Sequence, residues 1–238
     1  MKRIFFIMFF FLFFLTHSQV TNSNELLFLK TSSKYGENLF KKENVTGTPF
    51  LFEKWQPTII YTDENKKLAF SKGNFLATKN KVLIKLREDF FEIFPDKVKY
   101  IVFERQGQKM ILAPIDRSLI KDKINPAKKA YYQIFTEDLN QIYVLKENRK
   151  KLVSKDVSKS YASDKTFEEM EYRKKSKFYI FNGEKYVRTK PQLKEIIKVL
   201  NAKDKYKQLK QFVKQNKLKL RNGYDLQKLM MYYFNELK

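Results

Sequence analysis

The chain has 238 residues, with 49 Lys and Arg against 26 Asp and Glu, one histidine and no cysteine. The formal net charge of +23 attracts polyanions such as nucleic acid, anionic lipid headgroups or acidic polysaccharide. Without cysteine the chain has no disulfides, thiol nucleophiles or thiolate metal ligands. Only eight of the basic residues are arginine, so a generally lysine-rich composition explains the charge better than a specific polyanion site does.

The first predicted element is a secretory signal over residues 1–18. Lys2 and Arg3 form a basic start, residues 4–15 are an unbroken apolar run, and Ser18 and Gln19 flank the expected cleavage site. The run is shorter than the roughly 20 residues that a bilayer-spanning helix needs. We therefore expect an exported protein, periplasmic or secreted, with no transmembrane segment once the signal is removed.

His17 lies inside this segment, so the exported chain would contain neither imidazole nor thiol. That would exclude Ser-His and Cys-His nucleophiles and His-ligated zinc. Carboxylate and lysine chemistry would remain possible. The sequence also carries no cofactor or metal motif, and we expect neither group.

Residues 19–48 form a polar lead-in, and a β domain is predicted over residues 49–187. Short β-type runs separated by turn residues favour an antiparallel, twisted β-meander or half-barrel rather than alternating βαβ units. The predicted runs are 58–62, 67–71, 74–77, 82–86, 97–103, 110–114, 130–135 and 141–145.

A polar stretch interrupts this domain at residues 146–176, which are rich in Lys, Ser, Asp and Glu. Because the stretch offers few apolar side chains for burial, we interpret it as a long surface excursion. A hairpin is predicted directly after it, with Asn182-Gly183 as a tight turn between residues 177–181 and 184–187.

Residues 188–238 change to a helical period. Leu193, Ile196, Ile197 and Leu200 follow the spacing i, i+3, i+4, i+7, and two further apolar stripes come after them. The pattern predicts three helices that pack on each other or on one face of the sheet. The expected fold class is therefore α+β, an antiparallel sheet followed by three C-terminal helices.

The most biased segment is residues 205–221, KYKQLKQFVKQNKLKLR, with seven basic residues and no acid. One interpretation is a cationic helix that binds a polyanion or an anionic membrane. The alternative is an amphipathic helix whose solvated face happens to be lysine. The possible polyanion contacts are Lys205, Lys207, Lys210, Lys214, Lys217, Lys219 and Arg221.

The residue patterns offer little support for an enzyme or for a nucleic-acid-binding protein. Acidic residues cluster at 88–92 and 168–171, and two converging carboxylates could serve a hydrolase. Both clusters lie beside lysines in polar stretches, where solvated charges are more usual. The chain contains no RNP-like, KH-like or zinc pattern, so nucleic acid is not an expected partner.

Four segments resemble a family of small exported, uncharacterised proteins of Gram-negative envelopes. They are GTPFLFEKWQPTI from Gly47, the strand from Phe135 to Lys146, the Lys177-Phe-Tyr-Ile segment leading to Leu193, and the final stretch Leu226 to Asn235. The resemblance implies export and a β-meander with a helical end, and it brings no catalytic residues. We expect a non-catalytic binding or scaffolding protein with a cationic surface and an envelope partner. The alternatives left open are a binder of polyanions or anionic lipid through residues 205–221, and a carboxylate-dependent hydrolase.

Overall fold

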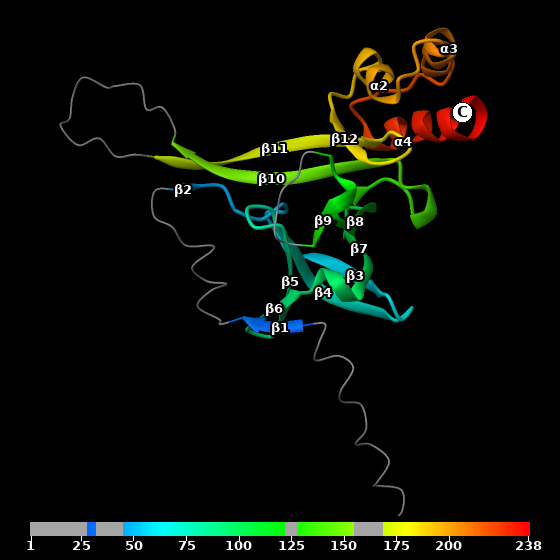
Figure 1. Cartoon of the computed structure of the whole chain (residues 1–238). Coiled ribbons are helices and arrows are strands. Elements are labelled where there is room, and N and C mark those ends of the chain that lie inside the picture. Colours follow the sequence, from blue (N-terminus) through cyan, green and yellow to red (C-terminus); the bar gives the residue numbers. More distant parts are fainter. Residues whose placement is uncertain (1–27, 32–44, 122–127, 155–168) are drawn as a thin grey trace, which may run out of the picture.

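The described residues of this computed structural model are 28–31, 45–121, 128–154 and 169–238. They form a large, mainly antiparallel β-sheet followed by three α-helices (Figure 1). This confirms the predicted α+β class. The predicted signal, with His17, Ser18 and Gln19, lies outside the described residues.

The sheet has 12 strands in the order β1-β6-β5-β4-β3-β7-β8-β9-β10-β11-β12, and β2 pairs with β11 in parallel. Strand β3 therefore lies between two runs of antiparallel neighbours, β4, β5, β6 and β1 on one side and β7 to β12 on the other. The strands are β1 (Phe28–Thr31), β2 (Val45–Thr46), β3 (Gln56–Thr62), β4 (Lys67–Leu76), β5 (Lys81–Leu86), β6 (Asp89–Ile93), β7 (Val98–Arg105), β8 (Gln108–Asp116), β9 (Lys129–Ile134), β10 (Val144–Ser154), β11 (Met170–Phe181) and β12 (Tyr186–Thr189). Short 3₁₀ turns are η2 (Pro95–Lys97), η3 (Arg117–Leu119) and η4 (Leu139–Gln141).

The sheet curls so that strands distant in its order come together. Asn80, between β4 and β5, accepts from the backbone N–H of Tyr131 in β9 at 2.8 Å and donates to its carbonyl at 2.9 Å. The Tyr131 hydroxyl donates to the carbonyl of Ile93 in β6. The buried side chains of β3 to β9 that face inward form one apolar cluster inside this curl. Twisted antiparallel strands curl in this way when one face must be buried.

The helices are α2 (Leu193–Leu200), α3 (Tyr206–Gln215) and α4 (Gly223–Tyr232), which continues as a π-helical turn, η5 (Tyr233–Leu237). They cover one face at the β9 to β12 end of the sheet, where their apolar stripes pack on Phe135, Val144 and Ile180. Gly223 begins α4 against the ring of Phe135, where an added Cβ would lie 2.0 Å from a ring carbon. None of the helices in the described residues has the length and apolar composition needed to cross a bilayer.

Gln227 fixes α4 to the sheet. Its side chain is 2% exposed, and its carbonyl oxygen accepts from the backbone N–H groups of Tyr143 and Val144 at 3.1 and 3.0 Å. Its amide donates to the carbonyl of Gln141. Buried amides of this kind hold a helix in one position because an unpaired partner would be unfavourable.

The interpretation of residues 146–176 as a polar excursion is wrong for its described part. Strand β10 continues to Ser154 and β11 begins at Met170, and the two pair without interruption from Val144↔Ile180 to Ser154↔Met170. The remaining residues, 155–168, lie outside the described part of the chain. Antiparallel hydrogen bonding propagates along a hairpin without an apolar core on both faces, so low apolar content does not end the strands. The runs 67–71 and 74–77 likewise form one strand, β4, and the lead-in contributes β1 and β2.

Candidate functional site

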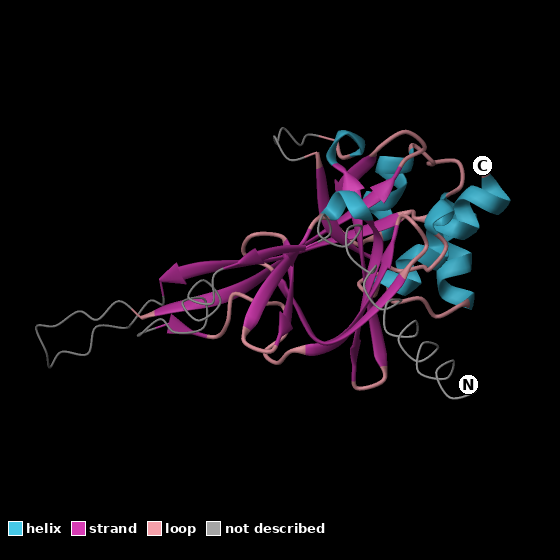
Figure 2. Cartoon of the chain, turned by 90° about the horizontal axis from the view of Figure 1, so that it is seen from below, coloured by secondary structure: helices cyan, strands magenta, loops and turns pink. Residues whose placement is uncertain are grey.

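The paired strands β10 and β11, named here the cationic hairpin, extend from the helices toward the opposite end of the molecule (Figure 2). Together they carry eight basic residues and two acids. This ratio of four to one is above the chain average of 49 to 26. The basic residues are Lys146, Arg149, Lys150, Lys151, Arg173, Lys174, Lys175 and Lys177.

Three consecutive cross-strand pairs of the hairpin oppose like charges. They are Arg149↔Lys175, Lys150↔Lys174 and Lys151↔Arg173. Opposed residues share a face and successive residues alternate, so the Lys150 pair occupies one face and its two neighbours occupy the other. Like charges directly opposite each other destabilise an antiparallel pair. The fold therefore holds positive charge on both faces of the hairpin against local repulsion.

Acidic neighbours offset part of this repulsion, with ion pairs on the face of Arg149 and Arg173. Arg149 is paired with Glu147 at 2.7 Å, and Arg173 is paired with Glu171. On the other face, burial and then the charge of Lys174 lower the pKa of Lys150, while Glu53 acts in the opposite direction. The pKa of Lys146 is lowered by the same two causes, burial first and Lys174 second.

A buried polar cluster anchors the inner end of the hairpin. Glu147 is 2% exposed and accepts a hydrogen bond from the Tyr179 hydroxyl at 3.0 Å. Burial and the Glu147 charge raise the pKa of Tyr179, and the same two causes raise that of Tyr132 to about 12. Both phenols are therefore neutral hydrogen-bonding groups near pH 7.

In the part of the chain described, the buried Nε and Nη1 atoms of Arg117 have no hydrogen-bond partner.

A groove of about 530 Å³ lies where the hairpin meets β12 and α2. Its charged lining comprises four basic side chains and one acid, Glu195, which itself pairs with Lys198 at 3.1 Å. The lining residues are Ser176, Lys177, Phe178, Arg188, Thr189, Lys190, Pro191, Glu195, Lys198 and Val199. The groove thus joins the hairpin through its first three lining residues.

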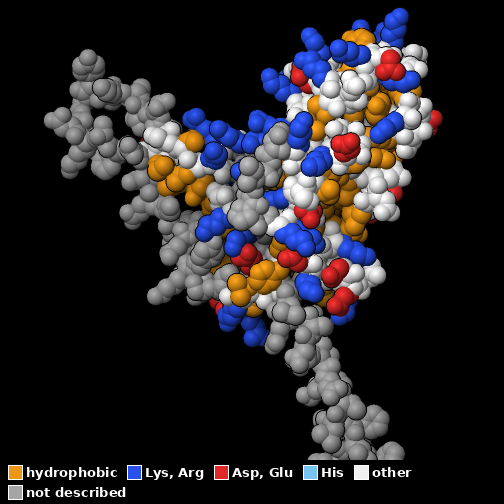
Figure 3. Space-filling model, viewed as in Figure 1, with side chains coloured by type: hydrophobic (Ala, Val, Ile, Leu, Met, Phe, Trp, Pro, Cys, Tyr) orange, Lys and Arg blue, Asp and Glu red, His pale blue; other side chains and the backbone are white. Residues whose placement is uncertain are grey.

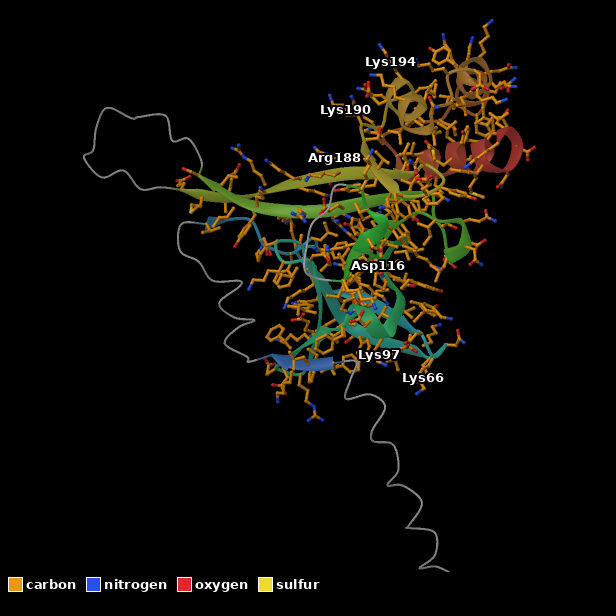
Figure 4. The ribbon with its side chains drawn as sticks, in the orientation of Figure 1. Lys66, Lys97, Asp116, Arg188, Lys190 and Lys194 are labelled. Atoms are coloured by element: carbon orange, nitrogen blue, oxygen red, sulfur yellow. The ribbon has the colours of Figure 1, made fainter. Side chains whose placement is uncertain are left out.

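The figures place these charges in space. Figure 3 shows Lys and Arg gathered along the hairpin and over the helical end of the molecule. In Figure 4, Arg188, Lys190 and Lys194 follow one another from β12 to α2, where the hairpin meets the helices. The basic residues of strand, loop and helix therefore adjoin each other at this junction.

The sequence-predicted basic segment 205–221 is not one helix. Helix α3 ends at Gln215, and Lys217 has a left-handed backbone with φ of 51°, so Lys217, Lys219 and Arg221 follow the helix. Lys205 is half-buried and pairs with Asp204 at 3.5 Å.

Lys207, Lys210 and Lys214 share the exposed side of α3, opposite Leu209, which is buried among the helices. This is the ordinary pattern of an amphipathic surface helix. The predicted polyanion contacts on α3 therefore lack the two features of the hairpin, which are opposed like charges and an adjoining groove.

The acidic clusters do not converge in the described residues. Asp89 pairs with Lys30, Glu92 with Lys81, and Glu88 with Lys85. Glu171 pairs with Arg173, and Glu168 lies outside the described part. The described residues contain no group of three or more His, Asp or Glu side chains placed to hold a metal ion.

Sequence reasoning missed both the hairpin and the groove. One sequence feature does mark the hairpin. The run RKK occurs at residues 149–151 and again at residues 173–175, and the two runs lie opposite each other once the strands pair. The groove has no such signal because its lining comes from three elements. Comparisons of the chain with protein families, with curated proteins and with solved structures found no match.

Proposed function

We propose that this protein is a non-catalytic binding protein that holds an acidic polysaccharide along the cationic hairpin. The observation that carries the proposal is the set of three opposed like-charge pairs in β10 and β11. An anionic polymer lying along these strands would relieve the repulsion between the opposed cations. The electrostatics of the hairpin therefore favour the polymer-bound state.

Positive charge on both faces of the hairpin favours a flexible polymer over a membrane. A planar bilayer contacts only one face of a two-stranded ribbon, whereas a polymer chain follows both. The choice of polysaccharide over nucleic acid rests on the predicted signal over residues 1–18, and we propose export to the bacterial envelope on the same ground.

The experiment measures binding of alginate, a carboxylated polysaccharide, to the protein. The protein is expressed from its full sequence and purified with the N-terminus that the cell leaves on it. The hairpin variant is Lys151→Gln with Lys174→Gln, two exposed residues. A lysine near a polyanionic surface contributes about 1 kcal/mol, so the double variant should bind alginate at least about 10-fold more weakly. Its affinity should also depend less steeply on salt, because fewer cations take part.

The charge-matched control is Lys207→Gln with Lys214→Gln on α3, where we expect less than a twofold change in affinity. Equal losses in the two double variants would contradict the hairpin as the binding site. Stronger binding to double-stranded DNA or to anionic phospholipid vesicles than to alginate would contradict the choice of polysaccharide.

A further inference from the structure

We infer that the groove between β11, β12 and α2 binds one carboxylate-bearing sugar unit of the polymer, so that hairpin and groove form one continuous binding track. This inference rests on the proposed function and adds the class of ligand unit that is recognised. It follows from the charge, the lining and the position of the groove.

The groove has an unbalanced positive charge. Lys177, Arg188, Lys190 and Lys198 face one acid, Glu195, whose charge is already shared with Lys198. Arg188 and Lys190 are exposed, and neither side chain makes an ion pair within the described part of the chain. A concave site lined by charges of one sign focuses their field on the ligand that enters it.

Arg188 gives the groove a geometric preference as well as a charge. Its planar guanidinium presents two parallel N–H donors, which match the two oxygens of a carboxylate. Three of the eight arginines in the chain lie on the hairpin or in the groove, at positions 149, 173 and 188. Arg149 and Arg173 are paired with glutamates, whereas Arg188 has no acidic partner among the residues that the structure describes.

The uncharged lining suits a sugar ring. Phe178, Pro191 and Val199 provide apolar surface, and the hydroxyls of Ser176 and Thr189 lie beside it. Thr189 donates to the carbonyl of Lys190 at 3.1 Å, so its oxygen retains lone pairs that accept from a sugar hydroxyl. A volume of about 530 Å³ lies in the usual range for small organic ligands and far exceeds what a single inorganic anion fills.

The position of the groove links it to the hairpin. Ser176, Lys177 and Phe178 belong to β11 and line the groove, and Lys174 lies two residues before Ser176 on the same face. A polymer lying along the hairpin therefore reaches the groove without leaving β11.

The test uses a trimer of galacturonic acid and its methyl ester, which has the same rings and no charge. We expect the native protein to bind the acid form and not the ester. Arg188→Gln should weaken trimer binding at least 10-fold, and Arg188→Lys should restore only part of it because the charge returns without the fork. Lys228→Gln, an exposed residue of α4 outside the lining, should leave the affinity unchanged.

Three results would overturn the inference: equal binding of acid and ester, equal losses in Arg188→Gln and Lys228→Gln, or displacement of the trimer by an equal concentration of inorganic phosphate. Unaltered thermal unfolding of Arg188→Gln establishes that the loss is local. If alginate still binds through the hairpin while the trimer does not bind, the groove inference fails and the proposed function stands. If alginate does not bind the native protein, the proposed function itself fails.

Discussion

Replacing Lys174 by glutamine should stabilise the protein at low salt. Lys174 lies directly opposite Lys150, and its charge lowers the pKa of both Lys150 and Lys146. Its own side chain has no ion-pair partner in the described residues. Glutamine keeps much of the length of the side chain and removes the charge, so the substitution relieves repulsion on this face without opening a cavity.

The expected gain follows from the geometry of the pair. Like charges directly opposite in an antiparallel pair destabilise by up to about 1 kcal/mol. Because Lys174 is exposed and solvent screens its charge, we expect about 0.5 kcal/mol. For a chain of this size about 1 kcal/mol corresponds to roughly 2–4 °C, so the Tm should rise by about 1–2 °C.

The assay is thermal unfolding at low and high salt. At about 0.01 M salt the screening length is about 30 Å and the gain should be complete, whereas at about 1 M it shrinks to about 3 Å and the gain should vanish. The control is Lys67→Gln, an exposed position on β4 opposite Tyr61 rather than a cation, where no gain is expected. A loss of stability in Lys174→Gln at low salt, or a gain that persists at high salt, would refute the electrostatic reasoning.

Three further predictions concern the fold. Gln227→Ala should lower the free energy of unfolding by about 2–4 kcal/mol, because it leaves the buried N–H groups of Tyr143 and Val144 unpaired. Urea unfolding measures this loss. A loss smaller than that of a substitution at an exposed site, such as Lys228→Ala, would contradict the prediction. Gly223→Ala should cost about 1–3 kcal/mol because the new methyl group meets the Phe135 ring, and pairing it with Phe135→Leu should recover part of the loss; no recovery would exclude a steric cause. Burial raises the pKa of Tyr132 and of Tyr186 to about 12, so the contribution of these two tyrosines to stability should be constant below pH 10. Between about pH 10 and 12 it should fall by about 1.4 kcal/mol per pH unit for each tyrosine, since the unfolded phenols ionise first. Tyrosinate absorbance from these two residues should then appear together with unfolding, and its appearance in a still-folded chain would contradict their burial.

The parts of the fold that follow from local patterns could be predicted from the sequence. The 3.6-residue stripes gave the three helices, and Asn182-Gly183 marked the turn that pairs β11 with β12. These features depend on residues close together in the chain, where periodicity and turn chemistry determine the outcome.

The parts that depend on distant pairing could not be predicted. The length of the hairpin is determined by the register between β10 and β11, and composition favoured a loop at the same residues. The curl of the sheet depends on Asn80 meeting Tyr131, 51 positions away. The groove needs β11, β12 and α2 in place before Arg188 and Lys198 line the same cavity, so its chemistry exists only in the folded chain.

Lysine footprinting with alginate tests the central claim most directly. The protein is acetylated with and without alginate, and the modification of each lysine is measured by mass spectrometry. We predict strong protection of the exposed hairpin lysines at positions 151, 174 and 175, and none of the exposed α3 lysines at positions 207, 210 and 214. Protection of the α3 lysines instead, or equal weak protection of both groups, would contradict the assignment of polyanion binding to the hairpin.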